Sequence, residues 1–136
     1  MDLATAQQFL TAHHRAVLAT RRRDGRPQLS PVSVGIDDAG RAIVSSRETA
    51  YKTRNLRRDP RGSLCVFMEE FYGPWVQIDG TAEVLSLPDA MEPLVDYYRR
   101  IAGEHSDWED YRRAMERDRR VLLRIRIDSA GPDRQG

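Results

Sequence analysis

The chain has 136 residues, of which 40% are hydrophobic and 32% are charged, and its formal net charge is only +1. This length and composition predict a single water-soluble globular domain, and they leave no apolar run near the roughly 18 residues that a membrane span needs. The near balance of charge also argues against a general nucleic-acid binder, which usually shows a large basic excess.

The first half of the chain is expected to form one short helix followed by strands and tight turns. Its predicted elements are a helix over residues 5–14 and strands over residues 16–20, 29–36 and 41–46. The pair Asp24-Gly25 favours the positive φ angles of a tight hairpin turn, and residues 37–40 indicate a second turn. Because Pro31 cannot donate a ladder hydrogen bond, its strand is expected at a sheet edge or a bulge.

The second half is expected to alternate helices and strands. Its predicted elements are a short helix within residues 46–60, strands over residues 62–70, 75–86 and 120–129, and helices over residues 88–102 and 106–118. The residues expected to begin these helices are Thr49 or Ser46, Pro88, and Ser106 in a capping-box pattern with Glu109. Six strands joined mainly by hairpins predict a mainly β antiparallel barrel with helical decoration over residues 1–130, followed by a flexible tail over 131–136.

The stretch KTRNLRRDPR, residues 52–61, carries five cations and one acid, and Lys52 is the only lysine in the chain. Lys52 falls in the first turn of a short helix, where unpaired backbone N–H groups and the helix dipole favour an anion such as phosphate. Further donors for that anion are Arg47, Arg54, Asn55 and Arg58. The alternative is a solvated helix whose charges are partly neutralised by Glu48 and Asp59.

Other chemistry is sparse in the sequence. The three histidines lack metal-ligand spacing, and no glycine-rich phosphate loop or Ser/His/Asp set is present. The lone Cys65 and the lack of a secretory signal predict a reducing cytoplasm, with Cys65 as a buried strand residue and not a nucleophile. These features favour a protein whose chemistry belongs to a bound cofactor. The segment FYGPW offers either an aromatic wall for a planar ring or aromatic surface for core or dimer packing.

A resemblance to a known family follows from the order of five segments. The segments are ATRRRDGRPQLSPV, RAIVSS, KTRNLRRDPR, IAGEHSDWEDYRRAM and RVLLRIRI. In this order they resemble the flavin/deazaflavin oxidoreductases with a pyridoxamine-phosphate-oxidase-like split barrel, over nearly the whole chain. KTRNLRRDPR and GEHSDW are similar to the branch that uses the deazaflavin coenzyme F420.

The resemblance implies a homodimeric, six-stranded antiparallel split β-barrel of the Greek-key, FMN-binding type, with two cofactor sites at the subunit interface. It places along the cofactor ring Gln28, Leu29, Ser30, Pro31 and Val32, and along the ribityl chain Val44, Ser45 and Ser46. It assigns Lys52 and Asn55 to the phosphate, and Trp75 and Gln77 to the segment supplied by the partner subunit. Relatives often carry an arginine where this chain has Ala50, and Arg47 is the expected replacement.

The expected function is therefore an F420-dependent oxidoreductase that transfers a hydride to or from a conjugated organic substrate. One alternative is an FMN-dependent relative of pyridoxamine-phosphate oxidase, and another is a non-catalytic carrier of the cofactor. An arginine-rich nucleic-acid binder is a third. The expected partners are a second copy of the chain and a small-molecule substrate, with no nucleic acid and no membrane. The proton donor is left open between Tyr72 and a bound water, and the substrate is not identified.

Overall fold

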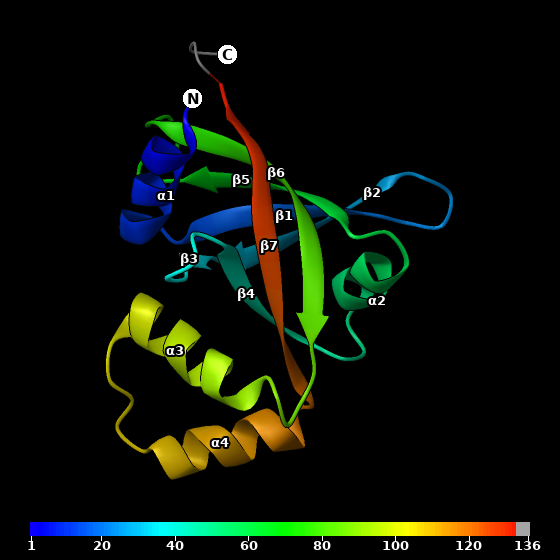
Figure 1. The fold of residues 1–136 in the computed structure, drawn as a ribbon, viewed down its shortest axis with the longest axis vertical. Helices are drawn as coiled ribbons and strands as arrows, with labels where there is room; N and C mark the ends of the chain where they lie inside the picture. The colour runs from blue at the N-terminus through cyan, green and yellow to red at the C-terminus, as the bar shows by residue number, and fades with distance from the viewer. Residues whose placement is uncertain (133–136) are drawn as a thin grey trace.

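The structure, a computed structural model, describes residues 1–132. In this part of the chain, one antiparallel sheet is surrounded by helices (Figure 1). The strands are β1 (Arg15–Arg21), β2 (Pro27–Ser33), β3 (Gly35–Ile36), β4 (Ala42–Arg47), β5 (Arg61–Phe67), β6 (Trp75–Leu85) and β7 (Arg120–Gly131). The helices are α1 (Leu3–Ala12), α2 (Tyr51–Arg58), α3 (Met91–Ala102) and α4 (Trp108–Arg117).

The sheet curls because its two edge strands are neighbours in the chain. The strand order is β2-β1-β5-β6-β7-β4-β3, so β2 and β3 lie at opposite edges although only Val34 separates them. The backbone N–H of Val34 donates to the carbonyl of His14 at 2.8 Å, which extends the β1–β2 pairing by one residue before the chain bends away into β3. The antiparallel, mainly β prediction is therefore confirmed. The sheet has seven strands where six were expected, because this bend divides the strand expected over residues 29–36.

The main core fills the inside of the curl. Alternate residues of β1, such as Ala16 and Leu18, point inward and are buried, as the two-residue period of a strand requires. Leu10 of α1 and Leu56 of α2 pack into the same core. Helix α2 is thereby anchored to the barrel through Leu56, while its charged residues remain near the surface.

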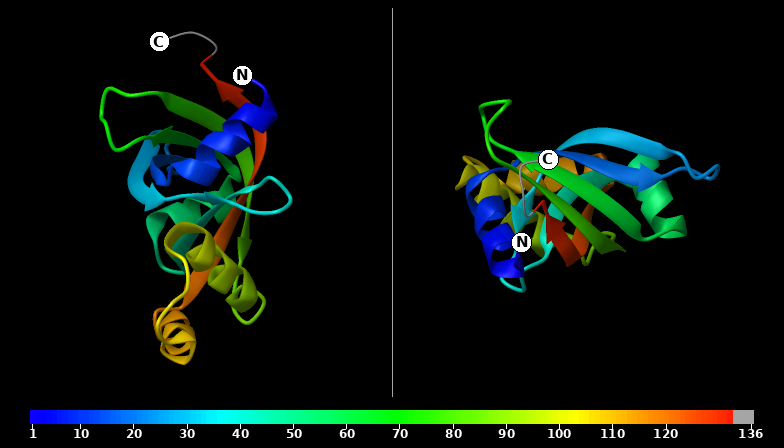
Figure 2. Two further views of the ribbon diagram at one scale, coloured as in Figure 1. Left: turned by 90° about the vertical axis from the view of Figure 1, so that its left-hand side faces the viewer. Right: turned by 90° about the horizontal axis from the view of Figure 1, so that it is seen from above.

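A second core lies on the opposite side of β4 and β7, against α3 and α4. Ile43 and Leu122 pack there with Leu94 and Tyr111. Both helices lie at the lower end of the molecule in Figure 1 and in the left-hand view of Figure 2. The face of β4 that carries Ile43 is therefore covered by helices.

Three helix starts differ from the sequence-based expectation. Helix α2 begins after Ala50, which gives no side-chain cap, because Ser46 is buried in β4 and Thr49 precedes the cap position. Helix α4 is capped by Asp107, whose carboxylate accepts a hydrogen bond from the backbone N–H of Asp110 at 3.1 Å, so Ser106 lies outside the helix. Pro88 likewise precedes α3, which begins at Met91 after a separate turn.

The two predicted turns are confirmed. Gly25 and Gly40 have φ angles of 86° and 77°, in the left-handed region that favours glycine. Strand β7 continues through Gly131, where the tail was expected to begin, and residues 133–136 lie outside the described residues. None of the described helices combines the length and the apolar run that a bilayer crossing requires.

Candidate functional site

Lys52 lies in the first turn of α2, close to the ends of two strands. It is half-buried, and this burial, followed by the positive charges of Arg120 and Arg47, lowers the pKa of Lys52. Arg47 ends β4 and Arg120 begins β7, and the two are directly paired in the β4–β7 ladder. We refer to Arg47, Lys52 and Arg120 as the Lys52 cluster.

The acids near α2 neutralise other arginines and not the Lys52 cluster. Glu48 pairs with Arg57 at 2.8 Å, and Asp59 pairs with Arg61 at 2.9 Å. Within residues 1–132, no ion pair or side-chain hydrogen bond joins Lys52 to a carboxylate. These two ion pairs agree with the solvated-helix alternative, in which Glu48 and Asp59 partly neutralise the stretch. They leave the positive charge of Lys52 unmatched. An anion from outside the chain would match it.

A second basic region lies on another face of α2. Four residues at helical spacing, Tyr51, Arg54, Asn55 and Arg58, face the β1–β2 hairpin and line a cavity of about 650 Å³. The hairpin contributes Arg22, Arg23, Asp24 and Gln28. The carboxylate of Asp24 already accepts two hydrogen bonds from the Arg26 side chain, at 2.9 and 2.7 Å. This cavity, which we call the arginine pocket, therefore keeps a strong positive excess.

Asn55 was expected at the phosphate, and the structure places it in a buried polar network. Its amide N–H donates to the hydroxyl of Thr20 at 3.1 Å, and its Oδ1 accepts from Arg58 at 3.0 Å. The same Arg58 nitrogen, Nη2, also donates to the backbone carbonyl of Arg21 at 2.7 Å. Both ends of the Asn55 side chain are thus engaged, and they fix Arg58 at the edge of the arginine pocket.

Strand β4 supplies three of the expected cofactor residues, and they differ in accessibility. The side chain of Val44 is fully buried in the main core. Ser46 is also buried, and its hydroxyl accepts a hydrogen bond from Thr53 of α2 at 2.8 Å. Ser45 is half-buried on the opposite face, paired with Leu122. Of the three side chains, Ser45 is the least buried, and it shares the face of β4 that carries Ile43.

Strand β2 divides the five residues expected along the cofactor ring between its two faces. Gln28, Ser30 and Val32 are half-buried, whereas Leu29 and Pro31 are exposed. Such alternation follows from the two-residue period of a strand. A ligand along β2 would therefore meet the side chains of one of these sets together with backbone groups.

Trp75 and Gln77 lie far from Lys52 within one chain. Both are exposed on β6. Thr81 of β6 pairs with Arg61 just after α2, and Trp75 is six residues from Thr81 along the strand. Six residues of strand span about 20 Å. One chain alone does not bring this pair to the Lys52 cluster, in keeping with the expectation that a partner subunit would supply it.

The outward side chains of β2, β1, β5 and β6 form a continuous surface that we call the outer sheet face. Its apolar members are Val17, Leu29, Pro31, Cys65, Phe67 and Trp75, aligned by the strand register. Leu29 is 61% exposed and Trp75 is 38% exposed. Cys65 was expected to be buried and is exposed on this face, so that prediction is wrong. Desolvation by its neighbours raises the pKa of the Cys65 thiol, which disfavours the reactive thiolate.

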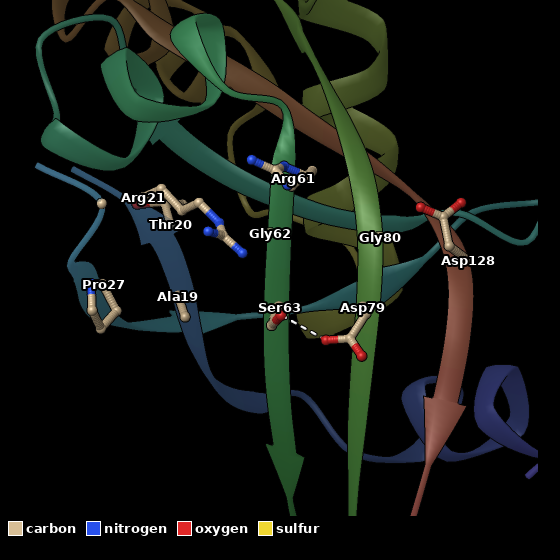
Figure 3. A pocket seen from close by; sticks show the side chains of 11 residues that line it. Ala19, Thr20, Arg21, Pro27, Arg61, Gly62, Ser63, Asp79, Gly80 and Asp128 are labelled. Atoms are coloured by element: carbon tan, nitrogen blue, oxygen red, sulfur yellow. Dashed lines mark hydrogen bonds between the residues drawn. The ribbon is translucent and has the colours of Figure 1, made fainter. Parts of the chain in front are cut away.

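One end of the outer sheet face is hollowed by a cavity of about 490 Å³. Figure 3 shows the hydrogen bond from Ser63 to Asp79 in this cavity, with Arg61 above it and Asp128 to the right. Hydrogen bonds from Ser63 and then Gln77 lower the pKa of Asp79. Asp79 therefore remains a carboxylate at neutral pH and is no proton donor.

The segments FYGPW and GEHSDW have different surroundings. Phe71 and Tyr72 form an edge-to-face pair, with ring centroids 5.1 Å apart, and Tyr72 is 97% exposed. In the GEHSDW segment, by contrast, His105 and Trp108 pack against Tyr98, with ring centroids 5.0 and 5.7 Å away. GEHSDW thus joins α3 to α4, whereas FYGPW offers free aromatic surface.

The comparison with protein families covers nearly the whole chain. Residues 3–131 match the family model described as pyridoxamine 5'-phosphate oxidase. The chain belongs to this family. This result confirms the family-level resemblance found in the sequence.

Solved structures place this pyridoxamine-phosphate-oxidase family member among related folds. A conserved hypothetical protein from Mycobacterium tuberculosis is 28% identical, with a TM-score of 0.77, over 96% of this chain and 82% of that one. An F420 reductase is 19% identical, with a TM-score of 0.69, over 92% of this chain and 94% of the other. An FAD-binding protein from Mesorhizobium loti is 22% identical, with a TM-score of 0.66, over 96% and 92% of the two chains. The last two likenesses concern the fold alone.

Sequence reasoning missed three basic residues of this family member that the fold brings to the site. Arg22 and Arg23 join the arginine pocket from the β1–β2 hairpin, and Arg120 joins the Lys52 cluster from β7. The run RRRDGR was a visible signal for the first two. Arg120 gave no such signal, because its place depends on the pairing of β4 with β7.

Proposed function

We propose that the protein is an oxidoreductase that binds coenzyme F420 and acts on a conjugated organic substrate. The observation that carries this proposal is the half-buried Lys52, which has no carboxylate partner in the described part of the chain. A phosphate at the start of α2 would supply the missing negative charge and accept hydrogen bonds from free backbone N–H groups. When bound, the deazaflavin supplies the hydride chemistry. The chain's own residues bind and orient the cofactor and exclude water.

The arginine pocket supports F420 over FMN. F420 carries a glutamate tail beyond its phosphate, so it presents more negative groups than FMN does. The Lys52 cluster and the arginine pocket lie on two faces of the same helix, so one ligand could meet both. The similarity in fold to an F420 reductase agrees with this choice. FMN remains the alternative cofactor, because the chain matches the pyridoxamine 5'-phosphate oxidase family and the alternative function is an FMN-dependent relative of that oxidase.

A second candidate function is a non-catalytic carrier of the cofactor. Hydrogen bonds, first of all from Ser63 to Asp79 and from Ser86 to Glu48, lower the pKa of these two carboxylic acids. Neither is therefore held protonated to give a proton to a reduced substrate. A reductase would take this proton from water or from a tyrosine such as Tyr72. Turnover of reduced F420 with conjugated acceptors distinguishes a reductase from a carrier.

The cofactor proposal is tested by titrating the apo-protein with F420 and with FMN at low and high salt. We expect tighter binding of F420 and a steeper loss of its affinity with salt, because exposed arginines meet the tail through screened interactions. Equal salt slopes would remove the arginine pocket from the site. Tighter binding of FMN would favour the alternative cofactor, and binding of neither would overturn the proposal.

We also propose that two copies associate through the outer sheet face. A contiguous apolar surface that includes the exposed Leu29, Pro31 and Trp75 is typical of an interaction site. In a symmetric dimer the same face is used by both copies. Association would also let Trp75 and Gln77 of one copy approach the cofactor of the other, as the family resemblance implies.

Sedimentation equilibrium tests the dimer, with Leu29→Arg as the disrupting variant. We expect the wild type to sediment at about twice its monomer mass. Leu29→Arg should shift it toward the monomer, because a charge would be buried at the contact. Labelling of Cys65 should be slow in the wild type and faster in this variant. A wild-type monomer at concentrations well above micromolar would contradict the dimer.

A further inference from the structure

Arg47 and Arg120 form a like-charge pair at the end of the β4–β7 ladder. They are direct Cα partners across the antiparallel strands β4 and β7. Side chains directly opposite in such a pair lie about 5 Å apart at Cβ, and like charges at that position repel each other. The half-buried Lys52 adds a third positive charge close to this pair, since, after burial, the charges of Arg120 and Arg47 both lower the pKa of Lys52.

Arg120 itself is incompletely satisfied. Its Nε atom is buried and has no hydrogen-bond partner among the residues that the structure describes. A buried N–H of a charged group without an acceptor is costly, and native proteins seldom retain one without a reason. The unpaired donor is therefore a sign that an acceptor comes from outside the chain.

The groups that face Arg120 from the packed helices do not supply this acceptor. Its charge is felt by Tyr97 of α3 and Tyr111 of α4, where it opposes the burial that raises the pKa of each phenol. Both phenols donate their protons elsewhere, Tyr97 to the carbonyl of Ser33 and Tyr111 to the carbonyl of Leu94, each at 2.8 Å. They line the site and bring no negative charge to it.

We propose that Arg120, together with Arg47 and Lys52, forms a binding site for a phosphate monoester, in which Arg120 is a direct ligand of the phosphate. The proposal rests on the proposed function only in taking this phosphate to be that of the cofactor. It adds a residue from the far end of the chain to the site at the start of α2.

Phosphate suits this site better than a carboxylate does. A phosphate monoester carries about −1.5 to −2 charges at pH 7 and offers three strong acceptor oxygens. Two guanidinium groups and an ammonium can each meet a different oxygen, and guanidinium groups match phosphate geometry in a bidentate way. A single carboxylate would leave most of the positive charge of the cluster unmatched.

Inorganic phosphate is the probe for the decisive experiment, at constant ionic strength maintained with chloride. Thermal unfolding and calorimetric titration are measured for the wild type, Arg120→Gln and Arg113→Gln. Arg113 lies exposed on α4, and among residues 1–132 its one ion-pair partner is Asp110 at 3.9 Å, so its variant matches the charge change outside the cluster.

We expect two opposite effects of Arg120→Gln. Without phosphate, its melting temperature should rise by about 1 to 3 °C, because a repulsive pair is removed. With phosphate, the stabilisation seen in the wild type should be lost, and phosphate affinity should fall at least about tenfold. Arg113→Gln should respond to phosphate like the wild type. A purely structural arginine would instead lower the melting temperature when replaced and leave the phosphate response unchanged.

The outcomes that overturn the site are equally definite. They are a wild type that phosphate does not stabilise, or an Arg120→Gln variant that responds to phosphate as the wild type does. If Arg120→Gln fails to fold, Arg47→Gln removes the exposed member of the same pair and must show the same loss. A protein that binds phosphate through Arg120 but binds no F420 would retain this site and lose the proposed function. A wild type that binds F420 but does not respond to inorganic phosphate would retain the proposed function and lose this site.

Discussion

Two partly buried arginines of this protein, Arg100 in α3 and Arg120 at the start of β7, have opposite surroundings. Arg100 donates from Nε to Asp96 at 2.7 Å, from Nη2 to Asp38 at 2.8 Å and from Nη1 to the carbonyl of Ile36 at 2.9 Å. Arg120 lies opposite Arg47 and has a buried Nε without a partner in the described residues. The first arginine is matched by the fold, and the second is left for a ligand.

The contrast separates charge that stabilises the fold from charge that favours binding. Arg100 ties α3 to β3 and to the turn before β4, so its hydrogen bonds are made when the chain folds. The Lys52 cluster has no such partners, so it costs stability until an anion arrives. Sites of this kind are a common reason why proteins are less stable than their sequences would allow. Variants at the two places should therefore have opposite effects on folding and binding.

The largest expected effect is on binding, in Lys52→Ala. Loss of a charge-assisted hydrogen bond typically costs roughly 1.5 to 3 kcal/mol, so F420 affinity should fall by about one to two orders of magnitude. Lys52→Arg should recover part of the lost affinity, because arginine keeps the positive charge but replaces the compact ammonium with a larger guanidinium. Calorimetric titration measures both variants, and the melting temperature of the apo-protein should not fall. Unchanged affinity in Lys52→Ala would mean that the phosphate binds elsewhere.

A somewhat smaller effect, on folding, is expected for Arg100→Ala. The change removes hydrogen bonds to two carboxylates and a carbonyl, and it should lower the free energy of unfolding by about 1 to 2 kcal/mol. F420 affinity should stay within about twofold of the wild-type value, because that change corresponds to less than 0.5 kcal/mol. Urea denaturation and the same titration give the two numbers. A large loss of affinity with intact folding would erase the distinction between the two arginines.

The smallest expected effect is the pH dependence of stability due to Lys52. Burial and then the charges of Arg120 and Arg47 lower its pKa from 10.5 in the folded protein. Between the lowered pKa and 10.5 the unfolded chain binds more protons, so the free energy of unfolding contributed by Lys52 rises with pH. Urea midpoints from about pH 8 to 9.5, below the range where tyrosines ionise, should show this rise.

Two comparisons isolate the Lys52 contribution. Lys52→Met should flatten the slope, because it removes the titrating group and keeps a side chain of similar length. Saturating phosphate should also flatten it, because a bound anion favours the charged ammonium. A slope that survives in Lys52→Met belongs to other groups and would contradict the assignment.

Much of the fold could be predicted from the sequence because its signals are local. The glycine turns at Gly25 and Gly40 and the alternation of β1 depend on neighbouring residues. Cys65 was misplaced because the run SLCVFM is apolar at successive positions, and this predicts burial on both faces of the strand. In the folded chain the outer sheet face also carries exposed apolar residues such as Leu29 and Trp75, so hydrophobicity alone could not tell the two sides of β5 apart.

The site was predictable only where its parts are close in sequence. Lys52 could be assigned to an anion because its helix start and its neighbours are adjacent in the chain. Arg120 lies half the chain length away, and its position opposite Arg47 depends on a strand register that no local pattern specifies. Nothing in the sequence excluded Asn55 from the expected phosphate ligands either, because its hydrogen bond to Thr20 forms only when α2 packs on β1.

The position of β7 in the sheet links the anion site to the order in which the chain is made. This strand is the last of those described along the chain, yet it lies between β6 and β4. Before residues 120–131 emerge during synthesis, β2-β1-β5-β6 and β4-β3 have no ladder between them, and two inner edges remain open. Arg120 then meets Arg47 in the same late event that closes the sheet. A nascent chain therefore has no complete phosphate site until its barrel has closed.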